Sequence, residues 1–126
     1  GDVRILIVAL GGNDGLRGLP VDQMKRNLAE IVSLARRHGI AVLLAGMEAP
    51  PNFGISYTAE FRRVFHELAS EHDVAFMPFL LEGVAGDPAL NQPDGIHPNA
   101  AGAAIVAERV QAALAPLLPA RTPALQ

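Results

Sequence analysis

An acid and an imidazole lie three residues apart in the stretch DGIHPN, which runs from Asp94 to Asn99. A neutral imidazole accepts a proton from a serine hydroxyl, and a carboxylate bonded to the other ring nitrogen fixes the tautomer and stabilises the imidazolium that forms. Asp94 and His97 are therefore candidates for a catalytic acid–base pair. A structural interpretation also fits, because Asp-Gly is a common turn and Asp94 can cap a helix.

A side-chain amide is the second candidate group. Asn13 stands in the stretch LGGNDG, directly after an apolar run. An amide in that position can donate a hydrogen bond to a developing oxyanion, which contributes roughly 2.7–4 kcal/mol in known enzymes. The glycines before it, Gly11 and Gly12, allow a substrate to approach the backbone closely. Taken alone, Asn-Asp-Gly is more often a simple turn. It is not a phosphate-binding loop, because no Gly-Lys-Ser/Thr follows.

Alternating apolar runs and helical periodicities indicate the elements that must position these groups. Three apolar runs, at residues 3–10, 40–45 and 74–79, predict buried strands. Apolar residues at helical spacing predict three helices. Their buried faces are Met24, Leu28, Ile31, Val32 and Ala35; Phe61, Val64, Phe65 and Leu68; and Val106, Val110, Leu114 and Leu117.

Local signals predict where these helices begin and end. Pro20 or Asp22 begins the first helix, and Gly39 follows it in the left-handed conformation. Ser56 or Thr58 is the expected cap of the second helix, and Asn99 that of the third.

The resulting order β-α-β-α-β-α predicts an α/β fold with a parallel sheet and helices on both of its faces. Residues 1–118 form one domain, and residues 119–126 are expected to be a loose tail. Ligands bind beyond the carboxyl ends of strands in such sheets, so the two motifs are expected to meet there. Three strands make a narrow sheet, and at least one of its edges is expected to need a partner strand.

Composition excludes several classes of function. The 126 residues carry a net charge of −3, half of them are hydrophobic, and there is no cysteine. Scattered basic residues do not favour binding to nucleic acid or to an anionic membrane surface. The absence of cysteine excludes disulfides, thiolate nucleophiles and zinc–thiolate sites. No apolar run reaches the roughly 18 residues that span a bilayer, and residues 1–10 resemble a strand rather than a signal peptide.

With both motifs in view, the chain resembles the SGNH hydrolase superfamily, also called the GDSL esterases and lipases. More narrowly, it is similar to the bacterial thioesterase I/protease I/lysophospholipase and arylesterase group. The segment from Leu10 to Gly18 matches that group's third block, and the segment from Asp94 to Asn99 matches its fifth. The stretch APPNFG, Ala49 to Gly54, resembles the substrate-side loop between them. The resemblance extends from about Val3 to Leu118.

The resemblance implies a flavodoxin-like three-layer α/β/α sandwich and specific roles for residues. His97 is the implied general base and Asp94 its orienting acid. Asn13 is the implied oxyanion donor, with Gly12 shaping the approach and residues 14–19 forming a mobile loop. Ala49 and Pro50 would line the acyl-binding groove. The implied substrate is a small acyl or aryl ester, and the resemblance also extends to thioesters and lysophospholipids. The resemblance implies that no cofactor or metal is required.

One part of the family's pattern is missing. The nucleophilic serine of the family stands in an N-terminal GDSL block, but Val3 occupies the corresponding place after Gly1 and Asp2. The remaining serines, Ser33, Ser56 and Ser70, are not credible nucleophiles. We therefore expect an N-terminal segment of the same protein to carry the serine, and the chain alone to be inactive. The alternatives are a separate N-terminal piece that pairs with this chain, or a natural remnant without hydrolase activity.

Two further expectations follow from the missing segment. We expect the bare chain to form a homo-oligomer through its exposed sheet edge. Relatives of this group are often periplasmic or secreted, which is the expected localisation here. The alternative to an esterase is a non-catalytic α/β binding or interaction module that uses the same cleft.

Overall fold

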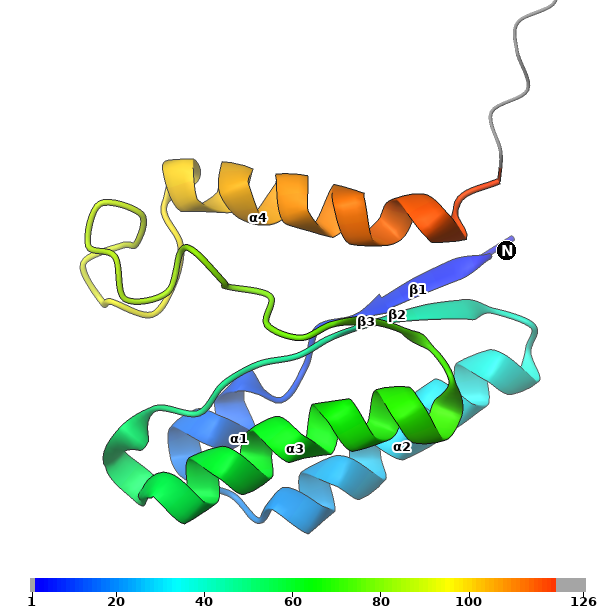
Figure 1. Ribbon diagram of the computed structural model, residues 1–126, viewed down its shortest axis with the longest axis horizontal. Helices are drawn as coiled ribbons and strands as arrows, with labels where there is room; N and C mark the ends of the chain where they lie inside the picture. Colours follow the sequence, from blue (N-terminus) through cyan, green and yellow to red (C-terminus); the bar gives the residue numbers. More distant parts are fainter. Residues whose placement is uncertain (1, 120–126) are drawn as a thin grey trace, which may run out of the picture.

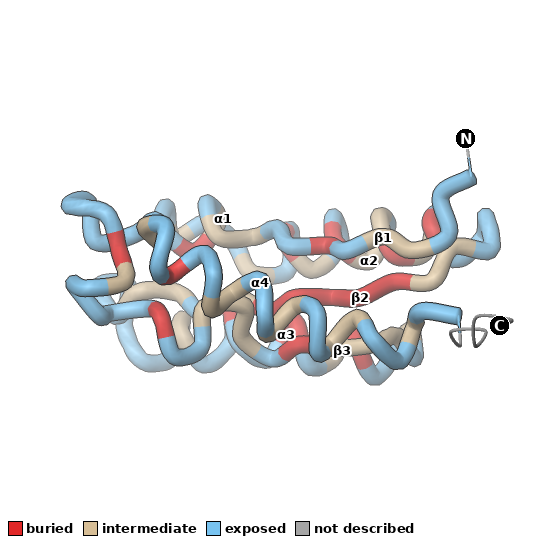
Figure 2. Tube along the Cα trace, turned by 90° about the horizontal axis from the view of Figure 1, so that it is seen from above, coloured by how far each residue is buried: buried red, intermediate tan, exposed pale blue. Residues whose placement is uncertain are grey.

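Three parallel strands form the centre of the computed structural model, which describes residues 2–119. They are β1 (Ile5–Val8), β2 (Ala41–Ala45) and β3 (Ala75–Met77), in the spatial order β1-β2-β3. Ile5 pairs with Ala41 on one side of β2, and Leu43 pairs with Ala75 on the other. The central strand is the most buried, as its red trace in Figure 2 shows.

Helices cover both faces of this sheet (Figure 1). The helices α2 (Val21–Arg37) and α3 (Ile55–His72) lie together on one face, and α4 (Ala100–Leu114) lies on the other. Side chains alternate between the two faces along a strand. Leu44 of β2 accordingly joins the core under α2 and α3, whereas Leu43 joins the core under α4. The predicted three-layer α/β/α arrangement with a parallel sheet is confirmed.

Several local expectations were wrong. Residues 14–19 were predicted as a loop, but most of them belong to a short helix, α1 (Gly12–Arg17). The left-handed residues Gly11 and Gly18 bracket this helix, so the glycines that signalled a turn instead end a helix on both sides. Two single-turn 3₁₀ helices, η1 (Pro51–Phe53) and η2 (Ala115–Leu117), were also not predicted.

The helix boundaries were predicted in part. Asn99 caps α4 as expected, because its side chain accepts a hydrogen bond from the Gly102 amide. Gly39 adopts the expected left-handed conformation, with φ +72°. Neither Ser56 nor Thr58 caps α3, since that helix begins at Ile55 after Gly54. The Thr58 hydroxyl instead donates to the Ile55 carbonyl within the first turn.

One edge and one face of the sheet stay open at β1. The strand pairs only with β2 among the described residues, so its outer edge carries free backbone groups. Ile7 points to the α4 side of the sheet, yet it is 41% exposed, because α4 packs over β2 and β3. Val3 and Leu10 at either end of the strand are exposed as well. The expectation of a narrow sheet with an unpartnered edge is confirmed.

Two further sequence expectations concern the C-terminal tail and the presence of membrane-spanning segments. The predicted loose tail falls largely on residues 120–126, which lie outside the described residues. Within the described residues, no helix has the length and apolarity needed to cross a membrane.

Gly102 brings the start of α4 against the chain that precedes it. A Cβ atom at this position would collide with the Leu90 carbonyl oxygen and would also crowd Val84. A helical Gly→Ala change ordinarily stabilises a protein by about 0.5–1 kcal/mol. Gly102→Ala should reverse that sign and destabilise the chain by about 1–3 kcal/mol, because the backbone must shift. Urea unfolding measures the difference; a more stable variant would show that the close approach is absent in solution.

Candidate active site

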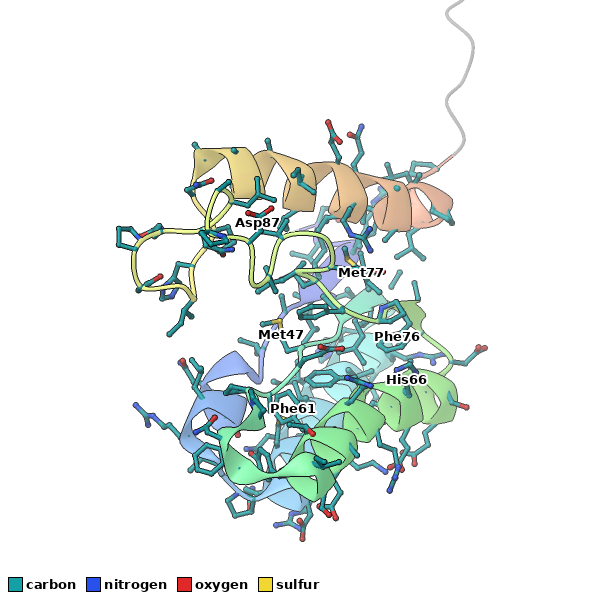
Figure 3. The ribbon with its side chains drawn as sticks, turned by 60° about the vertical axis from the view of Figure 1, so that its left-hand side comes forward. Met47, Phe61, His66, Phe76, Met77 and Asp87 are labelled. Carbon is teal, nitrogen blue, oxygen red and sulfur yellow. The ribbon has the colours of Figure 1, made fainter. Side chains whose placement is uncertain are left out.

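A cavity opens at the carboxyl ends of the strands, between the two layers that flank them. Its volume is about 1080 Å³, and Asn13 and His97 both line it. Gly12, Ala49 and Pro50, the other predicted site residues on its wall, line it too. Met47 lies between α1 and the segment that carries His97 (Figure 3). Groups about 80 residues apart in the sequence therefore face one space.

Asp94 and His97 are in direct contact. The His97 Nδ1 and the Asp94 Oδ2 are 2.6 Å apart. The other carboxylate oxygen, Oδ1, accepts hydrogen bonds from the backbone amides of Ile96 at 2.9 Å and His97 at 3.1 Å. The carboxylate thus holds both the ring and the backbone of the same histidine. The turn interpretation therefore does not exclude the acid–base interpretation, because the same carboxylate makes both sets of contacts.

The charge on Asp94 determines which ring nitrogen of His97 carries the hydrogen. The hydrogen bond from His97 and the bonds from the two amides lower the pKa of Asp94 from 3.8 to about 2. An ionised carboxylate can only accept hydrogen bonds, so Nδ1 of His97 must carry the hydrogen. In the neutral ring the lone pair is then on Nε2, the nitrogen that is free to accept a proton.

A network of amide side chains holds the segment that carries this pair. The buried Asn91 donates through Nδ2 to the carbonyls of Val84 and Asp87, both at 2.8 Å. Gln92 donates through its side chain to the Pro98 carbonyl at 3.1 Å, and its backbone amide donates to the His97 carbonyl at 2.7 Å. Asn99 donates to the Ala89 carbonyl at 2.8 Å while it caps α4. Sequence reasoning missed Asn91 and Gln92, and the concentration of amides in NQPDGIHPN was the available signal.

Asn13 reaches the cavity from the first turn of α1. It is exposed, and no hydrogen bond holds its side chain within the described part of the chain. The amide is therefore free to donate to a bound group. Gly12 precedes it on the cavity wall, where a Cβ atom would approach the Met47 Cε at 3.5 Å. That distance is an ordinary van der Waals contact, so the backbone at Gly12 is not crowded on this side.

The described wall of the cavity carries no hydroxyl nucleophile. Neither serine nor threonine is found among the described residues that line it. Ser33 lies within α2, and both Ser56 and Ser70 are exposed on α3. The described residues also contain no group of three or more His, Asp and Glu side chains placed to hold a metal ion.

The Asp94–His97 contact predicts a specific titration. The carboxyl of Asp94 should titrate near pH 2, well below its ordinary value, because its charged form accepts three hydrogen bonds. Since the folded-state pKa is lowered, the contact stabilises the fold fully above about pH 4 and is lost as the pH falls toward 2. Carboxyl ¹³C chemical shifts followed from about pH 1 to 7 measure the midpoint. A midpoint for Asp94 at its ordinary value of 3.8 would contradict the contact.

Comparison with known proteins gives one consistent result. The family model described as the GDSL-like lipase/acylhydrolase family matches residues 1–105. The chain is 44% identical over 114 residues to esterase TesA of Pseudomonas aeruginosa, a match that covers 90% of this chain and 57% of the esterase. It is 36% identical over 106 residues to an arylesterase of Vibrio mimicus, with 84% and 53% covered. The Escherichia coli thioesterase 1/protease 1/lysophospholipase L1 is 36% identical over 115 residues, with 91% and 55% covered.

Solved structures agree with these relatives. The crystal structure of TesA superposes with a TM-score of 0.86 at 44% identity and covers 90% of this chain and 63% of that one. The SGNH-hydrolase family esterase AlinE4 gives a TM-score of 0.70 at 43% identity, with 93% and 62% covered. The chain spans little more than half the length of the curated relatives, and it matches their C-terminal part. By sequence and by fold, this chain belongs to the GDSL-like lipase/acylhydrolase family and has the architecture of the SGNH hydrolases.

Proposed function

We propose that this chain forms the C-terminal part of a serine ester hydrolase and supplies all of its acid–base machinery. The observation that carries the proposal is the shared cavity, onto which the paired imidazole of His97 and the free amide of Asn13 both open. The serine comes from an N-terminal segment of the same protein. The substrates are small acyl or aryl esters, and thioesters and lysophospholipids are further members of the class.

The geometry of the groups supports a separate role for each of them. A serine hydroxyl attacks the acyl carbonyl, and Nε2 of His97 accepts its proton, because Nδ1 is bonded to Asp94. Asn13 donates a hydrogen bond to the oxyanion of the tetrahedral intermediate. His97 then protonates the leaving alcohol or thiol, and a water molecule hydrolyses the acyl-enzyme by the same steps. Throughout the neutral pH range Asp94 is ionised and orients the ring.

The lining of the cavity supports an apolar acyl or aryl group. Its walls include Leu10, Leu16, Met47 and Ile96, with Ala49 and Pro50 on one side. Burying such a group removes apolar surface from water, at about 25 cal/mol for each Å². No Lys or Arg is found among the described residues of the wall. The cavity therefore offers shape and apolar surface rather than positive charge.

The open side of β1 is where the serine-bearing segment fits. A strand added in parallel to the outer edge of β1 would end at the same edge of the sheet as the cavity, so a serine directly after it would face Asn13 and His97. The uncovered face at Ile7 and an apolar groove of about 710 Å³ along α4 offer a site for a following helix. That groove reaches His97, whose side chain is 68% exposed.

A second copy of this chain would compete for the same edge. We propose that the bare chain associates through β1, whereas the complete enzyme covers this edge itself. Size-exclusion chromatography with light scattering separates the two cases. An oligomer that persists with the edge covered would place the interface elsewhere.

The bare chain is expected to be inactive. The 126-residue protein should hydrolyse p-nitrophenyl butyrate no faster than its His97→Ala variant, because the described cavity wall contributes no attacking hydroxyl. Initial rates measured at the same protein concentration provide the comparison. Robust turnover that His97→Ala abolishes would refute the proposal that another segment supplies the nucleophile.

Activity should appear when the N-terminal part of esterase TesA is joined ahead of Val3. In that complete enzyme, His97→Ala should lower kcat by about 10⁴-fold or more, and Asn13→Ala by about 10²–10³-fold. The matched controls are His38→Ala and Asn52→Ala, since neither residue lines the cavity. A folded but inactive fusion, or equal losses in the variants and their controls, would favour a non-catalytic binding module.

A further inference from the structure

Four aromatic rings spaced four residues apart form a ladder beside α1. They are Phe53, Tyr57, Phe61 and Phe65, and successive ring centroids lie 5.6, 6.2 and 5.5 Å apart. Residues four apart lie on one face of a helix, which explains why the rings of α3 stand in a row. We call this set the aromatic ladder. Its outer end at Phe53 is partly exposed, and its inner end at Phe65 is buried in the core.

The segment that presents Asn13 lies on this ladder, with a glycine at each of three rings. A Cβ atom on Gly15 would stand 2.9 Å from the Phe61 ring, and one on Gly18 would stand 2.7 Å from the Phe53 ring. A Cβ atom on Gly11 would lie 3.1 Å from Phe65. At Gly15 and Gly18 a Cβ atom would force the ring to shift, and at Gly11 it would be in tight contact with the ring. The glycines of GGNDGLRG therefore bring the backbone onto the rings, a role separate from the approach of a substrate.

Tyr57 is the polar member of the ladder, and its hydroxyl reaches the first turn of α1 and the residue that follows its C-terminal cap. It lies 2.7 Å from the Leu19 carbonyl oxygen and 3.2 Å from the Asp14 carbonyl oxygen. The phenol donates its single hydrogen to this pair of acceptors. Burial, followed by the nearby charge of Asp14, raises the pKa of Tyr57, so the hydroxyl keeps its hydrogen at neutral pH. One side chain thus joins α3 to the first turn of α1 and to the residues after it.

We propose that Tyr57 is the positioning residue for Asn13. The inference rests on the proposed oxyanion role of that amide. The Asn13 side chain has no hydrogen bond of its own within the described residues, so its place in the cavity depends on the backbone of α1. Packing on the ladder sets the distance between α1 and α3. The Tyr57 hydroxyl stops the short helix α1 from rotating or unwinding. A preorganised donor stabilises an oxyanion without reorganisation at the moment of reaction.

Tyr57→Phe tests this role with the smallest possible change, because it removes one oxygen and keeps the ring. In the complete enzyme it should lower kcat about three- to tenfold and leave KM within about twofold, as expected for a group that acts only in the transition state. Amide hydrogen exchange at residues 15–19 of the 126-residue chain should become about tenfold faster. Thr58→Val is the matched control. It also removes a hydroxyl bonded to a carbonyl, but that bond stays within α3.

A double-mutant cycle separates positioning from general stability. In the Asn13→Ala background, Tyr57→Phe should change kcat by less than twofold, because the group that it positions is gone. Equal effects of Tyr57→Phe in both backgrounds, or unchanged exchange at residues 15–19, would overturn the inference and leave the proposed function standing. Normal activity of Asn13→Ala itself would overturn the proposed oxyanion role, and the positioning role with it.

Discussion

The contact between His97 and Asp94 is the interaction on which the site depends. One carboxylate receives the ring hydrogen of His97 through one oxygen and two backbone amides through the other. It therefore determines the tautomer of the imidazole and the shape of the turn together. Because three hydrogen bonds favour its charged form, the carboxylate stays ionised and keeps this arrangement throughout the neutral pH range. The rest of the loop, with Asn91 and Asn99 as its main supports, keeps that turn facing the cavity.

The two walls of the cavity are built by different means. The wall with His97 is an irregular segment whose backbone is satisfied by amide side chains, since it has few partners in regular structure. The wall with Asn13 is a short helix that packs on aromatic rings through its glycines. A six-residue helix is not stable alone in water, so the contacts with α3 must hold it. The sheet brings both walls to the carboxyl ends of its strands.

The sequence predicted the features that depend on local or periodic signals. The three strands, the three long helices, the Asn99 cap and the left-handed Gly39 follow from spacing and residue type. The proximity of Asp94 and His97 follows from a separation of three residues within one loop. The helix α1 was missed because Asn-Asp-Gly is a turn signal, and only tertiary packing on Phe61 makes it helical. Tyr57 was missed for a related reason. Its partners, Asp14 and Leu19, are about 40 residues away, and no local pattern connects them.

The unpartnered edge of β1 and the greater length of the relatives are consistent with each other. A sheet edge with exposed apolar side chains at Val3 and Ile7 is unfavourable in water, and relatives extend well beyond the region that this chain matches. We propose that His97 accepts the proton of a serine from outside the described residues, while Asn13 binds the oxygen of the carbonyl group that this serine attacks. The most direct measurement is a crystal structure of the complete enzyme with a phosphonate bound to that serine. The account predicts the serine Oγ within about 3 Å of His97 Nε2 and a phosphonyl oxygen about 2.7–3.1 Å from Asn13 Nδ2. A phosphonate oxygen that points away from Asn13, with His97 out of reach of the serine, would contradict it.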